Sequence, residues 1–366
     1  MNICMLSELF YPYLLGGAER RYFEIAKRLA KNHDVTVYSL NLYGEKKEEI
    51  KDGVRIKRVG LKHPKTQRSL PQLATYFPAL LRAVSKEYDI VDANQGIASY
   101  AGLLKKTTQR PVVATFHDIY WDKWKNHFGG HISFPGKVME ASWSKLSYSA
   151  IIANSKQTKE KLENLGVKSH IEIIFSGIDL GTIKSIKAKK ENKIIFVGRL
   201  VKYKNVDILI RTFAEIKKDK KDLELVIVGE GPEKNNLYRL SKSLNVKVEF
   251  KGFLSEKEKI KEIKSSLVLV NPSSVEGLGL IILESMACGT IPVGLDLNCY
   301  DAFCKKNNSI LVKKPVEIKE KIRSLLSENN RRKKLEKNGT RTAGNFSWDL
   351  TAEKVERLYN SVLDHK

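Results

Sequence analysis

Short runs of β-branched and apolar residues alternate with helical patterns along the whole chain, and this alternation limits the possible folds more than any other feature. Strands that are each followed by a helix form parallel sheets covered by helices, unlike a β-sandwich or a helix bundle. The sequence therefore predicts an α/β protein. Expected strands of the first half span residues 2–6, 35–40, 54–59, 90–93, 112–116, 150–153 and 171–174, with helices near 18–31, 72–86, 97–107, 137–148 and 155–165.

A polar, lysine-rich stretch at residues 176–193 interrupts this alternation. The chain has 366 residues, which suits two domains of roughly 170 residues each. We expect Rossmann-like, doubly wound domains at residues 1–175 and 194–345, joined by that linker. Residues 346–366 should form a helix that crosses back to the first domain. Expected strands of the second half span 194–197, 223–228, 246–250, 267–271, 291–294 and 310–312, with helices near 204–218, 232–243, 256–264, 279–287, 316–327 and 348–364.

Ligands of open α/β sheets bind beyond the carboxyl ends of the strands. Two such domains in succession should therefore face each other across a central cleft that holds the ligands.

The four cysteines and the apolar segments bear on the compartment and on metals. No Cys-x-x-Cys pair and no histidine at zinc spacing is present, so neither a disulfide framework nor a metal site is indicated. The apolar start contains Glu8 and has no basic residue before it, unlike a signal peptide, and no other apolar run approaches the ~20 residues of a spanning helix. We expect a cytoplasmic protein, with peripheral attachment to the inner face of the cell membrane as an open alternative.

The formal charge of +23 calls for an anionic partner or surface. Residues 53–86 contain eight basic and no acidic residues, together with an apolar and aromatic helical stripe. Such a segment is typical of a surface that rests on anionic lipid or binds a phosphorylated acceptor. A solvated basic face over an ordinary core stripe explains it equally well, and both interpretations stay open. The basic residues are Arg55, Lys57, Arg58, Lys62, Lys65, Arg68, Arg82 and Lys86.

The strongest candidate site lies in residues 271–284, which follow an expected strand and open an expected helix. Gly277 and Gly279 allow backbone N–H groups to approach a ligand, and a helix N-terminus favours a phosphate. Glu276 lies near the helix start, and Glu284, in the second turn, can accept hydrogen bonds from vicinal hydroxyls. Two glutamates at this spacing are common by chance, so the pair alone predicts little.

A second candidate element follows the expected strand 194–197. Arg199 and Lys204 come after its carboxyl end, where two cations can grip a diphosphate. The alternative, a solvated loop in a lysine-rich protein, fits Lys202 better than Arg199. A further glycine turn, Gly229-Glu230-Gly231, ends the next strand and can be a tight connection only.

Several segments together carry a family resemblance. VGRLVKYKNVDILI, VIVGEGPE, EFKGFL and NPSSVEGLGLIILESMACGTIPV, in this order and spacing, resemble the retaining nucleotide-sugar glycosyltransferases of family 4, also called glycosyl transferases group 1, which have the GT-B fold. The first half is similar through GGAER at residues 16–20 and TFHD at 115–118, and the ending through FSW at 346–348.

The resemblance implies a donor site in the second domain. Arg199 and Lys204 would hold the donor diphosphate, Glu276 would address the transferred sugar, and Glu284 would take the ribose hydroxyls. The next segment would bind the distal phosphate through its amides, and a preceding loop would lie near the base. These two segments are Gly277, Leu278, Gly279 and Leu280, and Gly252, Phe253 and Leu254.

From the first domain, which would bind the acceptor, the resemblance implies that Gly16 and Gly17 close over the phosphates and that His117 reaches the reacting sugar or acceptor. His117 follows a strand end, and Asp118 beside it could orient the imidazole ring. A lone histidine in a loop is more often polar surface, but this position favours function.

The implied reaction is a metal-independent transfer of a hexose-type sugar from a UDP or GDP donor to a glycan or lipid-linked acceptor, with no cofactor. Arg199, Lys204 and the helix terminus can stabilise the leaving diphosphate, and the chain contains no Asp-x-Asp to bind a metal. Residues 295–301 and Asn308-Ser309 depart from the family pattern, which puts inferences about the donor in doubt.

Two other functions stay open. A nucleotide-sugar epimerase would share the fold and the donor site. A nucleic-acid-binding protein would explain the charge, although no recognisable nucleic-acid motif supports it and we expect no such partner.

Overall fold

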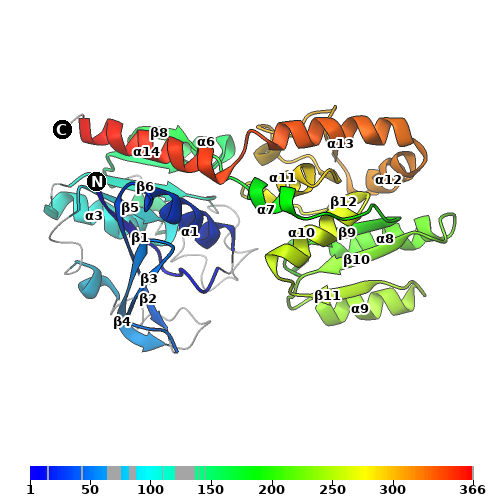
Figure 1. The fold of residues 1–366 in the computed structure, drawn as a ribbon, viewed down its shortest axis with the longest axis horizontal. Coiled ribbons are helices and arrows are strands. Elements are labelled where there is room, and N and C mark those ends of the chain that lie inside the picture. The colour runs from blue at the N-terminus through cyan, green and yellow to red at the C-terminus, as the bar shows by residue number, and fades with distance from the viewer. Residues whose placement is uncertain are drawn as a thin grey trace. The chain divides into compact units, whose positions relative to one another are not determined.

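The computed structural model describes residues 1–14, 16–42, 44–63, 76–81, 88–108, 110–119, 137–138, 140–143 and 145–364. The chain forms two compact units, here called unit 1 (Met1–Gly177 with Trp348–Lys366) and unit 2 (Ile178–Ser347) (Figure 1). The chain therefore passes from unit 1 to unit 2 and back again. Most of the expected helix at 72–86 and part of that at 137–148 lie outside the described residues.

Unit 1 contains an eight-stranded sheet of order β3-β4-β2-β1-β5-β6-β7-β8. Its pairings are parallel except that of β3 with β4. The strand order reverses between β1 and β5, which makes the sheet doubly wound. The strands are β1 (Asn2–Leu6), β2 (Asp34–Leu42), β3 (Glu48–Lys51), β4 (Val54–His63), β5 (Ile90–Asn94), β6 (Val112–Phe116), β7 (Ala150–Ala153) and β8 (Ile171–Ile173).

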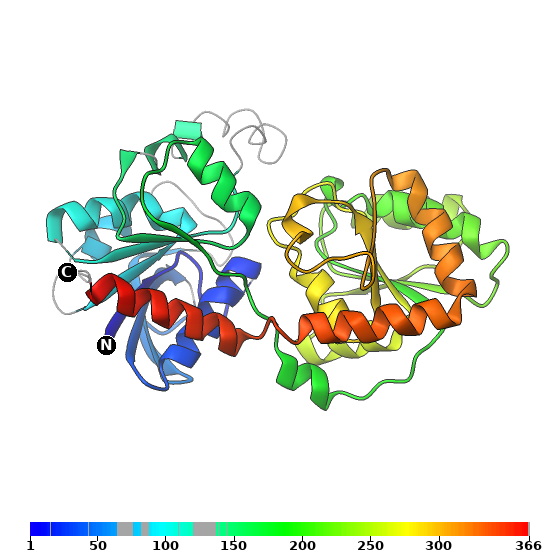
Figure 2. The same cartoon turned by 90° about the horizontal axis from the view of Figure 1, so that it is seen from above.

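Alternate side chains of this sheet enter two separate cores. Ile3 and Met5 of β1 belong to one apolar cluster, and Cys4 and Leu6 belong to the other, as the alternation of side chains along a strand requires. The first cluster contains residues of α1 and α14, which pack against each other (Figure 2). The described helices are α1 (Gly17–Leu29), η1 (Gln95–Ile97), α3 (Ala98–Thr108), α6 (Lys156–Asn164) and α14 (Trp348–Asp364).

Unit 2 contains a wholly parallel six-stranded sheet of order β11-β10-β9-β12-β13-β14. Its strand order reverses between β9 and β12, so the loops after these two strands flank the position where such sheets bind ligands. The strands are β9 (Lys193–Val197), β10 (Glu224–Val228), β11 (Glu249–Gly252), β12 (Val268–Asn271), β13 (Ile291–Leu295) and β14 (Ile310–Val312).

The helices of unit 2 complete the α/β alternation. One of them, α10, begins with a capping box in which Ser255 and Glu258 bond each other's backbone N–H groups. The helices are α7 (Leu180–Ser185), η2 (Lys202–Lys204), α8 (Val206–Lys217), α9 (Lys234–Ser243), α10 (Glu256–Ser265), α11 (Leu280–Ala287), η3 (Asn298–Tyr300), η4 (Pro315–Glu317), α12 (Ile318–Ser327) and α13 (Asn329–Ala343).

The predicted α/β class is confirmed, and most expected strands lie within two residues of the observed ones. The strand expected at 246–250 is displaced to Glu249–Gly252, because Val246 and Val248 pack on the core without pairing. The segment expected as a linker contains α7, whose N-cap Asp179 accepts a hydrogen bond from the Thr182 backbone N–H.

Candidate active site

The loop after β9 is held against the neighbouring strand end by backbone hydrogen bonds. Gly198 N–H donates to Val228 O (3.0 Å) and Leu200 N–H to Glu230 O (2.9 Å). A Cβ atom at Gly229 would lie 1.9 Å from the carbonyl oxygen of Gly198, so only glycine permits this approach. The glycine turn thus supports the loop that carries Arg199.

Arg199 projects from this loop as an exposed side chain. Within the described part of the chain, its side chain makes no hydrogen bond or ion pair, and only its backbone oxygen is bonded, by Val201 N–H at 3.1 Å. Its guanidinium group is therefore free to bind an anion.

Lys204 and Glu276 meet across the β9 and β12 loops. Lys204 Nζ lies 2.5 Å from Glu276 Oε1, and Asn271 Nδ2 donates to the same oxygen at 3.0 Å. Both charged side chains are mostly but not wholly buried, at 14% and 12% exposed. The structure therefore brings two of the sequence-predicted residues together in one cluster.

Backbone contacts fix these two loops to each other. Tyr203 O accepts from the backbone N–H of Ser274 (2.9 Å), and Asn205 Nδ2 donates to Pro272 O (3.0 Å). Asn205 takes the left-handed conformation, with φ of 51°, which asparagine tolerates better than most residues. The loops that carry Lys204 and Glu276 are thus bonded to each other through their backbones.

The N-terminus of α11 follows this cluster without a side-chain cap. Its N-cap residue Gly279 has φ of +72°, and a Cβ there would lie 2.4 Å from Cε1 of Tyr300. The first backbone N–H groups of a helix have no partner within it, so this terminus can bind an anion. Gly277 and Leu280 flank Gly279 and are half-buried, whereas Leu278 is buried in the protein.

Tyr300 belongs to the segment that departs from the family pattern. Its ring packs on Gly279, and its hydroxyl group is 3.1 Å from Asn271 Nδ2, which also bonds Glu276. The departure therefore supports the candidate site instead of removing it. Asn308 is buried and bonds Phe303 O (2.9 Å), which indicates a structural role.

Glu284 lies in the second turn of α11 and is buried, at 7% exposed. Its Oε2 accepts a hydrogen bond from Lys259 Nζ at 2.7 Å, and Lys259 also contacts Glu256 at 3.0 Å. Sequence reasoning missed Lys259, because nothing in the sequence pairs α10 with α11.

The loop predicted to lie near a base follows β11. Gly252 has φ of +64°, and its carbonyl oxygen accepts from Gly229 N–H at 2.7 Å. Phe253 is 86% exposed, more than any other large hydrophobic side chain of the described residues, and Leu254 is half-buried. Phe253 thus offers a bare aromatic face beside the strand ends.

In unit 1, the predicted glycines open α1. Gly16 is the N-cap residue of α1, and both Gly16 and Gly17 are exposed. A Cβ at Gly16 would lie 2.9 Å from Glu19 Oε2, so a larger residue would displace that carboxylate.

His117 follows β6 and contacts the end of β5. Its Nε2 lies 2.9 Å from Asn94 Oδ1, and its backbone N–H donates to Gln95 Oε1 at 2.8 Å. Asp118, which we expected to orient the ring, instead accepts from Lys161 Nζ (2.5 Å) and from Ile119 N–H (2.8 Å). Asn94 is thus the residue that contacts the imidazole. Its position at the carboxyl end of a strand was the sequence feature that could have identified it.

The ring of His117 is held neutral. Burial, and secondarily the positive charge of Arg21, lower its pKa from 6.5 to about 3. Arg21 is itself fully buried, and burial lowers its pKa to about 10. His117 therefore carries no charge at neutral pH.

A carboxylate cluster lies deeper in the same unit. Asp92 of β5 accepts hydrogen bonds from Tyr22 Oη (2.6 Å), Tyr359 Oη (2.5 Å) and Thr115 Oγ1 (3.1 Å). Burial raises the pKa of Asp92, although these hydrogen bonds oppose the shift. Because Tyr359 lies on α14, the cluster ties that helix to the sheet.

The basic segment is only partly a surface. Arg55 and Lys62 are exposed and Lys57 is half-buried, but Arg58 is buried at 2% exposed. Its guanidinium group bonds Glu49 (2.5 Å) and the carbonyl oxygen of Tyr11 (2.8 Å), so Arg58 cannot serve as a free surface cation. Lys65, Arg68, Arg82 and Lys86 lie outside the described residues.

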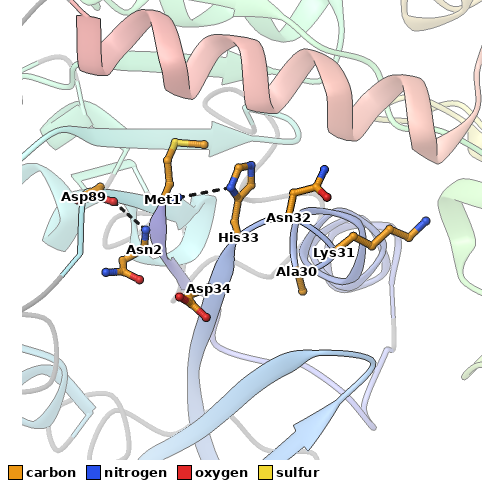
Figure 3. Close-up of a pocket in the computed structure, with 8 residues that line it drawn as sticks. All are labelled: Met1, Asn2, Ala30, Lys31, Asn32, His33, Asp34 and Asp89. Atoms are coloured by element: carbon orange, nitrogen blue, oxygen red, sulfur yellow. Dashed lines mark hydrogen bonds between the residues drawn. The ribbon is translucent and has the colours of Figure 1, made fainter.

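A polar pocket of about 380 Å³ lies at the amino ends of β1 and β2 (Figure 3). Met1 and His33 approach each other there through the terminal amine and Nδ1 (3.4 Å), and Asn2 N–H donates to Asp89 (2.7 Å). This is the sheet edge opposite to the carboxyl ends, where ligands of such sheets bind. We therefore assign no donor-site role to this pocket.

The described residues contain no group of three or more His, Cys, Asp or Glu side chains placed to hold a metal ion. None of their helices combines the length and the apolar character that crossing a membrane requires.

Solved structures share this architecture over the whole chain. Sucrose-phosphate synthase from Thermosynechococcus elongatus covers 100% of both chains with a TM-score of 0.84 at 18% identity. HepE from Anabaena, solved with UDP and glucose, covers 99% of this chain and 100% of its own, with a TM-score of 0.79 at 18% identity. With its two Rossmann-like units, the protein has the GT-B fold, and both the predicted fold and the predicted class are confirmed.

Family comparison gives the more specific assignment. The model of glycosyltransferase family 4 matches residues 15–182, and that of glycosyl transferases group 1 matches residues 182–342. An uncharacterized glycosyltransferase of Methanocaldococcus jannaschii is 26% identical and covers 97% of both chains. The chain belongs to the group 1 glycosyltransferases.

Proposed function

We propose that this enzyme transfers a hexose-type sugar, with retention at the anomeric carbon, from a UDP- or GDP-linked donor. Unit 2 binds the donor, and unit 1 binds a glycan or lipid-linked acceptor. The observation that carries the proposal is the Lys204–Glu276 contact at the β9/β12 reversal, beside the exposed Arg199 and the uncapped N-terminus of α11.

The leaving diphosphate gains negative charge as the anomeric bond breaks. Arg199, Lys204 and the α11 amides supply preorganised positive potential at that position, and loss of one such donor typically costs ~3 kcal/mol. Glu276 accepts a hydrogen bond from Lys204 in the structure. We assign Glu276 to the transferred sugar and give it no covalent role.

The nucleoside is recognised by two groups. Glu284 accepts hydrogen bonds from the ribose hydroxyls, and Phe253 stacks on the base. Base–aromatic stacking is worth ~1–3 kcal/mol, and it needs an exposed ring such as Phe253. A UDP donor is supported by HepE, which was solved with UDP.

The acceptor has an anionic or lipid-linked character in this proposal. Arg55 and Lys62 are exposed on β4 of unit 1 and support a phosphorylated or membrane-bound acceptor. We also propose that Gly16 and Gly17, at the start of α1, bind phosphate and that His117 contacts the reacting sugar or the acceptor.

The test is a thermal-shift panel of UDP, GDP, ADP and their sugars, with and without EDTA. We expect selective stabilisation by one nucleotide, retained in EDTA and lost in both Arg199→Ala and Glu284→Ala. Stabilisation that needs a metal, or that survives both substitutions, contradicts the proposal. Incubation with donor alone separates transfer from epimerisation, since only an epimerase then alters the sugar.

A further inference from the structure

A chain of hydrogen bonds between β1 and β6 fixes the direction of every proton in it. Ser7 Oγ donates to the carbonyl oxygen of Leu9 at 2.7 Å, which uses the only hydrogen of the hydroxyl group. Ser7 can therefore only accept from Asn94, so the Asn94 group at 3.2 Å is the amide NH₂. The orientation of the Asn94 amide thus follows from the Leu9 carbonyl oxygen, which can only accept a hydrogen bond.

The other end of Asn94 gives the same answer independently. The backbone N–H of Gln95 donates to Asn94 Oδ1 at 2.9 Å, which requires an oxygen at that position. The same oxygen lies 2.9 Å from His117 Nε2. An amide oxygen cannot donate, so His117 Nε2 carries the hydrogen of this bond.

A neutral imidazole has one N–H, so Nδ1 of His117 carries a lone pair. The Tyr22 ring packs edge-on against the His117 ring, at 6.5 Å between centroids. The side chain is partly exposed, and no described residue bonds Nδ1. A fixed hydrogen-bond acceptor thus lies at the carboxyl edge of the sheet.

The charges around the ring favour its neutral form. Arg21 of α1 repels a proton on His117, and burial acts in the same direction. Asp118 is neutralised by Lys161 of α6, and Asp92 of β5 is engaged by Tyr22 and by Tyr359 of α14. No carboxylate of the described residues bonds the ring.

We propose that Asn94 is a positioning residue that holds His117 in the Nε2–H tautomer, so that Nδ1 accepts a hydrogen bond from a hydroxyl group of the transferred sugar or the acceptor. This inference rests on the proposed glycosyl transfer. The partner must be a donor such as a hydroxyl group, because the lone pair on Nδ1 can only accept a hydrogen bond. Carbonyl and phosphate oxygens, which also only accept, cannot bind there.

The first experiment reads the tautomer directly, by ¹⁵N NMR of the full-length, histidine-labelled protein. We expect a neutral ring protonated at Nε2 in the wild type, and loss of that fixed state in Asn94→Leu. A ring protonated at Nδ1 overturns the proposal. This readout needs no substrate, so it stands even if the protein transfers no sugar, which would contradict the proposed function alone.

The second experiment compares activity against pH. Asn94→Asp keeps the shape but places a carboxylate on Nε2–H, which favours the imidazolium and removes the Nδ1 lone pair at neutral pH. We expect its activity to fall at least 10-fold at pH 7 and to recover at higher pH. Asn164→Asp, which adds the same charge to unit 1 at an exposed position of α6, is the control and should keep the wild-type profile. An unshifted profile in Asn94→Asp overturns the proposal.

Substitution of His117 tests which nitrogen matters. The amide of Asn occupies approximately the position of Nδ1, and that of Gln the position of Nε2. We expect His117→Asn to retain roughly 10-fold more kcat than His117→Gln, because its oxygen can replace the accepting lone pair. Equal loss in both variants, with the wild type active, contradicts a role for Nδ1.

Discussion

Asp92 of unit 1 and Glu276 of unit 2 are both carboxylates, but their surroundings differ. Asp92 lies within the central strand β5, and Glu276 lies in the loop after the central strand β12. Asp92 is 2% exposed and receives three hydroxyl groups. Glu276 is 12% exposed, uses one oxygen for Lys204 and Asn271, and lies near the exposed Arg199. The closed cluster holds the fold, whereas the open cluster keeps binding capacity for a ligand.

The largest expected effect is on the closed cluster. Asp92→Leu leaves the hydroxyl groups of Tyr22 and Tyr359 and the buried Arg21 without their acceptor or counter-charge. We expect a loss of about 3–5 kcal/mol in the free energy of unfolding, measured by urea denaturation. Tyr359→Phe, which removes one hydrogen bond, should lose about 1–3 kcal/mol. If Asp92→Leu unfolds like the wild type, the distinction between the two clusters fails.

The next largest effect is on activity and concerns Arg199, beside the open cluster of Glu276. Arg199→Ala should lower kcat/KM by about 10²–10³-fold, as for loss of a charge-stabilising donor, with an unchanged urea midpoint because the side chain is exposed. Lys202→Ala, another exposed cation of the same loop, is the control and should keep near-normal activity. Equal losses in both variants would reveal a general charge effect instead of a specific contact.

A smaller effect is expected at Lys259, which shares features of both clusters. Lys259→Met frees the Glu284 carboxylate from its ion pair, so the side chain loses its orientation toward the ribose. We expect the donor KM to rise by roughly 10-fold with kcat little changed, since a ribose contact is made equally in the ground state and the transition state. Lys261→Met, on the exposed side of α10, is the control, and Lys259→Arg should restore most of the affinity. A fall in kcat with constant KM would contradict this role.

The smallest expected effect is the loss of folding stability at acidic pH that His117 causes. Its folded-state pKa of about 3 lies below the ordinary 6.5, so between these values the unfolded chain binds a proton that the folded protein does not. Stability is therefore fully present above pH 6.5 and is lost as pH falls toward 3. The partly exposed ring limits the loss. Urea denaturation at pH 7 and 5 should show a larger decrease for the wild type than for His117→Asn, and an equal decrease would contradict the assigned pKa.

Most elements with an apolar pattern could be predicted from the sequence, and so could the polar helices α6 and α10, but two other polar elements could not. The expectation missed β3, an edge strand of sequence EEIK, and α13, whose buried residues are only Leu335, Gly339 and Ala343. In both elements, contacts with the rest of the unit outweigh the weak local pattern.

For the candidate site, the sequence predicted which loops contribute residues, but not all the side chains that contact each other. Lys204 and Glu276 were singled out, and they do meet, because parallel strands place their carboxyl ends at one edge. The partners Asn94 and Lys259 were not predicted, because each contact joins elements 23 or 25 residues apart and depends on side-chain direction. The prediction that Arg58 belongs to a basic surface was wrong, because Glu45 and Glu49 neutralise its charge. The sequence alone does not show that these two acids lie next to Arg58.

The return of α14 to unit 1 has a consequence for biosynthesis. Unit 2 is one continuous stretch, Ile178–Ser347, and can fold as soon as it leaves the ribosome. Unit 1 must wait for Tyr359 before Asp92 has all its partners, although its strands are translated first. Truncation before Trp348 should therefore leave unit 2 folded, while unit 1, which has lost α14, unfolds and makes the whole chain prone to aggregation.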